Sequence, residues 1–218
     1  PQLGRLDLGP DAGAHTAFPL LGIGGAATGA GAKPRDYVVV TAESLADACR
    51  EPRQKAWFVD VSDEAKPRIV ANWTVAEANG NFCSRGGRFG THSSNESFTP
   101  VYYRRVVFFA HFNAGVRAVD VRDPLHPREL GYYVPAPNAN TGGVIQTNNV
   151  EVDERGYIYI TDRAGTGMHI LELTGAARAI AALKKACAER VAAFTQGRGA
   201  LRTVRGSRAR SAAPSPCV

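Results

Sequence analysis

The sequence predicts an all-β fold made of repeated units. Apolar and polar residues alternate with a period of two along much of the chain, as expected of strands that bury one face. The sequence of one strand and its turn occurs twice in similar form, as FVDVSDEAKPRI at 58–69 and AVDVRDPLHPREL at 118–130. The 23 glycines and 13 prolines among 218 residues are typical of a turn-rich globular protein. Together these observations favour a stacked β-repeat, in which each unit buries the faces of its neighbours.

Three segments of the chain share one layout, in which two alternating runs are separated by a loop. They are residues 37–41 with 57–75, residues 105–135 and residues 156–175. The glycines of the loops FNAG (112–115) and RAGTG (163–167) predict antiparallel hairpins, because glycine readily adopts the positive φ that such loops need. The first two copies continue through a Pro-containing turn to a third run, which is missing from the last copy.

Side chains in the repeated turns predict structural roles. The Asp of SDEAKP and of RDPLHP is expected to cap backbone amides, and the following Pro is expected to send the next strand back. Asp60, Asp120 and Glu172 recur at one strand position and are expected to accept hydrogen bonds from the next turn. Adjacent aromatic residues place one ring on each face of a strand, which predicts that both faces are core. These pairs are Tyr102 and Tyr103, Phe108 and Phe109, and Tyr132 and Tyr133.

A polar segment with an apolar run precedes each copy, starting near His15, His92 and Asn149. With it, each unit has about four strands, and four-stranded blades around an axis define a β-propeller. The three units and a leftover strand at 3–9 predict a partial or small ring of three to four blades. Closed propellers usually have more, so the chain is interpreted as part of a larger ring, a shortened chain or a partner in an assembly. The alternative is a β-sandwich of short strands.

The pattern xVDVSDPxxPxxLG at 58–70 and 118–131 resembles the LVIVD repeat, a propeller-forming module of bacterial and archaeal proteins. The longer stretch from FCSRGGRFGTHSSNE to TDRAGTGMHILEL is similar to the C-terminal part of LVIVD-repeat proteins. The resemblance covers about residues 14–173. It implies a β-propeller and no particular activity, because the family is defined by its blades.

The blades are assigned to residues 1–175, and the end of the chain differs from them. Residues 176–196 predict an amphipathic helix with one apolar stripe, and residues 197–218 predict a disordered, Arg-rich tail. Residues 178–218 hold nine Lys and Arg against one Asp or Glu, whereas residues 1–177 hold 17 against 19. Because the basic tail lacks interleaved aromatic residues, nucleic acid is not an expected partner. No stretch approaches the length of a membrane span.

Histidines supply the candidate metal ligands. In a propeller the first strand of each blade lines the central channel, so equivalent residues of neighbouring blades converge there. His15 and His92 are predicted to bind a divalent transition metal, with Glu96 and His111 as further ligands. No other cofactor is expected. The alternative is that these side chains tie strand ends to neighbouring backbone carbonyls.

Two further candidate sites are an anion site and a disulfide. Arg85 and Arg88 lie in the glycine-rich segment CSRGGRFG (83–90), which predicts an anion site or, alternatively, a tight connection between blades. Cys49 and Cys83 are candidates for a disulfide if the protein is exported, and are otherwise two free thiols. A periplasmic or secreted location is preferred to a cytoplasmic one.

Two functions are consistent with these features. The first is a non-catalytic β-propeller module that serves as a binding scaffold for a protein or cell-surface partner. The alternative is a metal-dependent enzyme with a His and Glu site at the channel. The basic tail suggests a third, an adaptor for nucleic acid, against which the missing recognition motif argues.

Overall fold

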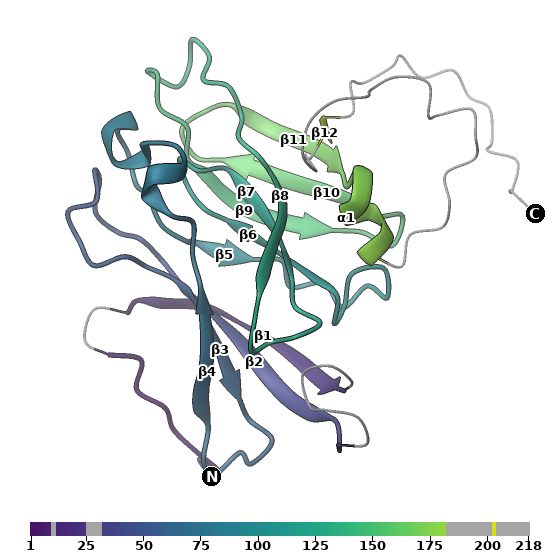
Figure 1. The fold of residues 1–218 in the computed structure, drawn as a ribbon. Coiled ribbons are helices and arrows are strands. Elements are labelled where there is room, and N and C mark those ends of the chain that lie inside the picture. Colours follow the sequence, from purple (N-terminus) through teal and green to yellow (C-terminus); the bar gives the residue numbers. More distant parts are fainter. Residues whose placement is uncertain (10–11, 25–31, 182–201, 204–218) are drawn as a thin grey trace, which may run out of the picture.

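The chain forms three antiparallel sheets that follow one another in sequence (Figure 1). A computed structural model describes residues 1–9, 12–24, 32–181 and 202–203. The first sheet contains β1 (Ala14–Ile23), β2 (Arg35–Ala42), β3 (Ala56–Asp60) and β4 (Arg68–Trp73). The second contains β5 (Ser93–Ser94), β6 (Val106–Ala110), β7 (Val116–Asp120) and β8 (Arg128–Tyr133). The third contains β9 (Thr147–Val152), β10 (Tyr157–Asp162), β11 (Gly167–Glu172) and β12 (Arg202–Thr203). The all-β prediction is confirmed.

The predicted hairpins form where the glycines stand. β6 pairs with β7 and β10 pairs with β11, both antiparallel. Gly115 closes the first hairpin with a φ of 78°, and a Cβ at this position would lie 2.1 Å from the backbone oxygen of Tyr133. Only glycine therefore fits this turn.

The repeated turn uses the same hydrogen bonds in both copies. Asp60 accepts a hydrogen bond from the backbone N–H of Ser62 at 3.0 Å, and Asp120 accepts one from that of Arg122 at 3.1 Å. The aspartates of the turn itself act in the same way: Asp63 and Asp123 each accept a hydrogen bond from the backbone N–H two residues later. The duplicated sequence is thus a duplicated strand and turn, as predicted.

The second sheet lies between the other two. Every residue of β6 and β7 is buried. Phe109 belongs to a core cluster with Phe18 and Phe58 of the first sheet. Phe108 belongs to a second cluster, with Ile158 and other residues of the third sheet. The three sheets are therefore stacked face to face in sequence order.

The first strands of the three sheets lie side by side. Ser94 of β5 donates its backbone N–H to Thr16 Oγ1 of β1 at 3.3 Å. On the other side, Ser93 of β5 donates its hydroxyl to Asn149 Oδ1 of β9 at 3.0 Å. The short strand β5 therefore lies between β1 and β9, so that these edge strands of the three sheets are neighbours.

Two segments outside the strands position residues of the candidate site. The 3₁₀ helices η2 (Glu77–Asn79) and η3 (Phe82–Arg85) connect the first sheet to the second. Cys83 of η3 forms a disulfide with Cys49, which lies in the loop between β2 and β3. The disulfide fastens this loop to the segment that leads into β5.

In the described residues, one helix and one strand follow β11. Helix α1 (Gly175–Ile180) packs Ala177 against the core of the third sheet. The rest of the helix predicted at 176–196, from residue 182 onward, lies outside the described residues. Strand β12 pairs with β11 and adds a fourth strand to the third sheet. Arg202 and Thr203 thus form a strand within the segment 197–218, which was predicted to be a disordered tail. Residues 197–201 and 204–218 lie outside the described residues. In the described ranges every helix is too short to cross a bilayer.

Candidate metal centre

The candidate site lies where the first strands of the first two sheets begin. Antiparallel pairing places the start of each first strand beside the end of the second strand, so β1 starts beside the end of β2 and β9 beside the end of β10. His15 lies in β1, Glu43 directly follows β2, and His92 directly precedes β5. Three side chains with metal-binding atoms therefore come from three neighbouring strand ends.

A β-bulge positions His15. Ala14 pairs with Ala42 and Thr16 pairs with Thr41, so His15 is the extra residue on the longer strand. Such bulges redirect the side chain of the unpaired residue. The imidazole of His15 meets that of His92 with their ring centroids 4.4 Å apart. The structure thus brings together the two predicted ligands that come from different sheets.

The carboxylate at this site belongs to Glu43. Its Oε1 lies 3.5 Å from Nε2 of His92. One ligand atom from each of His15, Glu43 and His92 lies within 4.8 Å of the other two. Glu43 was not among the predicted ligands. Its place directly after a second strand puts it opposite the start of the first strand, but its local sequence is like that of other charged loop residues.

Burial keeps His92 ready to act as a ligand. The residue is 5% exposed, and this burial lowers the pKa of its imidazole, which the Glu43 carboxylate only partly opposes. The ring is therefore neutral at pH 7 and has a free lone pair to donate to a metal. Its Nδ1 is buried near the main chain of Asn148 and forms no hydrogen bond of ordinary geometry with the described residues.

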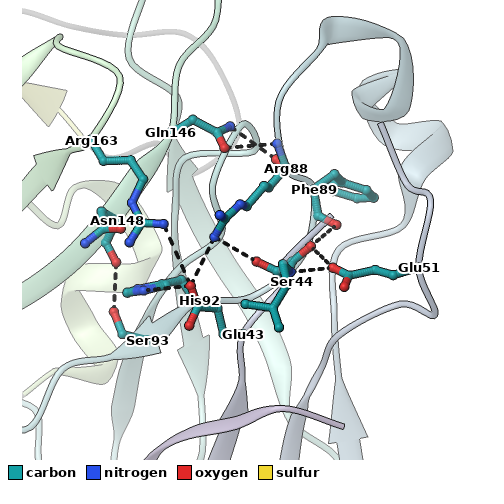
Figure 2. Close-up of polar contacts among 11 residues, drawn as sticks. Glu43, Ser44, Glu51, Arg88, Phe89, His92, Ser93, Gln146, Asn148 and Arg163 are labelled. Carbon is teal, nitrogen blue, oxygen red and sulfur yellow. Dashed lines mark hydrogen bonds and ion pairs between the residues drawn. The ribbon is translucent and has the colours of Figure 1, made fainter. Parts of the chain in front are cut away.

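Two arginines approach the same carboxylate (Figure 2). Nη1 of Arg88 lies 3.2 Å from Glu43 Oε1, and Nη1 of Arg163 lies 3.8 Å from it. Both guanidinium groups also stand over the ring of Phe112, at 5.4 and 5.6 Å from its centroid. Gln146 joins the two segments, since its Oε1 accepts the backbone N–H of Arg88 and its backbone oxygen accepts that of Arg163. Each of the three sheets therefore contributes to the surroundings of Glu43.

The other predicted ligands lie elsewhere. Glu96 is exposed, and its backbone N–H donates to the carboxylate of Glu151. His111 is fully buried, and its Nε2 accepts the backbone N–H of Val75 at 3.4 Å. Neither residue joins His15 and His92 in the metal-binding group found among the described residues. His111 therefore contacts the backbone of the segment that follows β4, but as the acceptor of an N–H and not through a backbone carbonyl as the alternative expected.

Buried His111 is expected to make the protein sensitive to acid. Burial lowers its pKa well below the ordinary value, so as the pH falls below about 6.5 the unfolded chain binds a proton that the folded chain does not. The stabilising effect of a neutral His111 is complete above that pH. Below it, the free energy of unfolding is expected to fall by up to about 1.4 kcal/mol per pH unit.

Urea titrations of wild type and His111→Gln between about pH 7 and pH 5 test this through the slope. Burial also lowers the pKa of His92 and His169, so these residues add to the slope of both proteins. The expected result is a shallower slope for the variant, whatever its absolute stability. His126→Gln is the control, since that side chain is 81% exposed. Equal slopes for wild type and His111→Gln would contradict the expectation.

The two arginines of the candidate anion site are separated by their contacts. Arg85 places its guanidinium over the ring of Phe82, 4.6 Å from the centroid. Arg88 turns to Glu43 and also donates to the backbone oxygen of Ser44 at 3.4 Å. The glycine-rich segment connects η3 to β5 and places Arg88 beside Glu43 of the metal-binding group.

Two imidazoles and one carboxylate form a donor set that proteins use for Zn²⁺ and Fe²⁺. Three protein ligands leave coordination positions for water or another ligand. Of the three residues, His15 is exposed and His92 is buried. The sequence matches no protein-family model and no curated protein.

Proposed function

We propose that this protein binds a divalent transition metal, Zn²⁺ or Fe²⁺, through His15, Glu43 and His92. The observation that carries the proposal is the convergence of these three side chains from two sheets, with their ligand atoms within 4.8 Å of one another. The lowered pKa of His92 supports it, because a ligand histidine must be unprotonated. The Zn²⁺ or Fe²⁺ ion would supply Lewis acidity and open positions for a ligand.

The three sheets are proposed to be consecutive blades of a β-propeller of the LVIVD-repeat kind. Two features of the described part support this. The middle sheet buries both faces against its neighbours, and the first strands of the sheets lie next to one another. Strand ends at corresponding places would then surround a channel, which makes the blades the rigid scaffold that presents the metal to a ligand or partner.

The Cys49–Cys83 disulfide supports a periplasmic or secreted location for this scaffold. Disulfides form and persist in oxidising compartments. The disulfide also holds the loop after Glu43 to the segment that carries Arg88 and leads to His92. The disulfide therefore reinforces the backbone contacts that join these two sides of the metal site.

Removing one ligand is expected to weaken metal binding strongly. His15→Ala is the cleanest variant, because the side chain is exposed and its loss leaves the core unchanged. Changes to groups that merely orient a ligand cost roughly 10- to 100-fold in affinity, so the loss of a ligand should cost at least about 100-fold. Calorimetric titration with Zn²⁺ and Co²⁺ measures the effect, and metal analysis of protein purified without chelators complements it.

Matched variants make this test specific. Glu43→Gln keeps the shape of the side chain and is expected to weaken binding in the same way. His126→Ala, on the exposed turn between β7 and β8, and Glu96→Gln are controls expected to bind like wild type. Equal affinities for wild type and His15→Ala, or weakening by Glu96→Gln instead of Glu43→Gln, would contradict the proposed ligand set.

A further inference from the structure

The Glu43 carboxylate lies near two positively charged side chains. Two guanidinium groups face this single carboxylate, and both approach the same oxygen, Oε1. That oxygen also lies nearest to Nε2 of His92, so it is the atom that a metal bound between the two residues would use. A metal and the two arginines therefore compete for one acceptor atom.

Metal binding would change the partners of the arginines unequally. Arg88 keeps its hydrogen bond to the backbone oxygen of Ser44. For the Arg163 side chain, the described residues offer one ion pair, the contact with Glu43 at 3.8 Å, and this side chain is 42% exposed. At 3.8 Å this contact is an ion pair without a hydrogen bond, and a metal on the Glu43 oxygen would take away the one carboxylate that pairs with Arg163 among the described residues.

The surroundings favour an anion as that acceptor. With a divalent ion present, one carboxylate would face two guanidinium groups and two metal charges, which leaves the site strongly positive. The ring of Phe112 is fully buried, lies beside both guanidinium groups and offers them no hydrogen-bond acceptor. Hydrogen bonds between a guanidinium group and an anion are charge-assisted and therefore stronger than neutral ones. The planar guanidinium matches the oxygens of phosphate in particular.

We propose that the metal-loaded site binds a phosphate-type oxyanion, which coordinates the metal and accepts hydrogen bonds from Arg163 and Arg88. The inference rests on the proposed function, because the metal frees the arginines from Glu43. It predicts an order of events: the metal binds first, and phosphate binds appreciably only afterwards. Metal and phosphate then stabilise each other's binding, as thermodynamic linkage requires.

Equilibrium dialysis with radiolabelled inorganic phosphate, at sub-millimolar concentration and with or without Co²⁺, tests the proposal. The visible spectrum of protein-bound Co²⁺ reports independently on the metal and on any change in its coordination. We expect phosphate binding with Co²⁺, none detectable without it, and a change in the Co²⁺ spectrum upon phosphate addition. Arg163→Gln should lower the phosphate affinity at least about 10-fold, as the loss of a charge-assisted hydrogen bond predicts. Its Co²⁺ affinity should not fall, since the variant loses a neighbouring positive charge.

Each outcome decides between the two proposals. Binding of Co²⁺ without binding of phosphate overturns the oxyanion inference and leaves the metal site standing. No binding of Co²⁺ overturns the metal site and this inference with it. Phosphate binding that is equal with and without Co²⁺ overturns the proposed order. Arg85→Gln is the matched control, because Arg85 comes from the same loop but stacks on Phe82; a loss as large as that in Arg163→Gln would also overturn the assignment.

Discussion

Replacing either Phe108 or Phe109 by Ala is expected to lower the free energy of unfolding by about 3–5 kcal/mol. The two residues are neighbours in β6 and point to opposite faces of the second sheet. Both are 0% exposed. Phe109 stacks on Trp73 of the first sheet with ring centroids 5.1 Å apart, whereas Phe108 packs in the cluster shared with the third sheet. Substitutions of two adjacent strand residues can both lower the free energy of unfolding this much only where both faces of the sheet are covered.

Urea denaturation, with the midpoint and m value fitted for each variant, measures the effect. Tyr132→Ala is the matched aromatic control, since Tyr132 lies on β8 of the same sheet and is 51% exposed, and it is expected to cost less than half as much. A two-layer sandwich with the second sheet at its surface would make one of the two Phe variants resemble wild type. That result would contradict the stacked arrangement of the three sheets.

The repeated strand and turn could be predicted because their structure depends on nearby residues. The hydrogen bond from the backbone N–H of Ser62 to the Asp60 carboxylate spans two residues, and the bond from Arg122 N–H to Asp120 does the same. The positive φ of Gly115 is likewise a property of one hairpin. Such short-range interactions leave a visible pattern in the sequence, and they explain why the repeated units and their antiparallel hairpins were predicted correctly.

The first strand of the second sheet and the last strand of the third were harder to predict. The segment at 91–103 forms only the two-residue strand β5, because the side chain of Asn95 takes the place of a ladder partner and accepts the backbone N–H of Phe108 at 2.8 Å. The outer strand of the third sheet, β12, comes from a region of the chain without an alternating pattern. An asparagine side chain that replaces a backbone partner leaves no periodic pattern in the sequence. Neither does a strand that a distant segment of the chain contributes.

The candidate site was predicted only in part, since it depends on contacts between sheets. The histidines stood out as residues that commonly bind metals, and the repeat placed His15 and His92 at the same end of their units. Glu43 and Arg163 each follow a second strand, and nothing in their local sequence distinguishes them from other charged residues of loops. Their convergence requires the three sheets to be stacked in order, together with the bulge that turns His15.

Breaking the Cys49–Cys83 disulfide is expected to lower the free energy of unfolding by about 2–4 kcal/mol. The two cysteines are 34 residues apart, and their Cα atoms lie 5.4 Å apart, within the range of ordinary disulfides. The bond closes a loop that contains β3 and β4, so in the unfolded chain it restricts much of the first sheet. Cys49→Ser with Cys83→Ser, compared with wild type in urea, measures the loss.

The reductant supplies the control for this prediction. Dithiothreitol should destabilise wild type to the level of the double variant and leave the double variant unchanged. The loop and the connecting segment also share backbone contacts, among them the hydrogen bond from Ala48 N–H to Gly87 oxygen at 2.8 Å. These contacts hold the folded loop in place without the bond, so the loss should arise mainly from a more disordered unfolded state, and the m value should rise as that state expands. If fully reduced wild type were as stable as the oxidised protein, the prediction would be contradicted. The disulfide would then not restrict the unfolded chain.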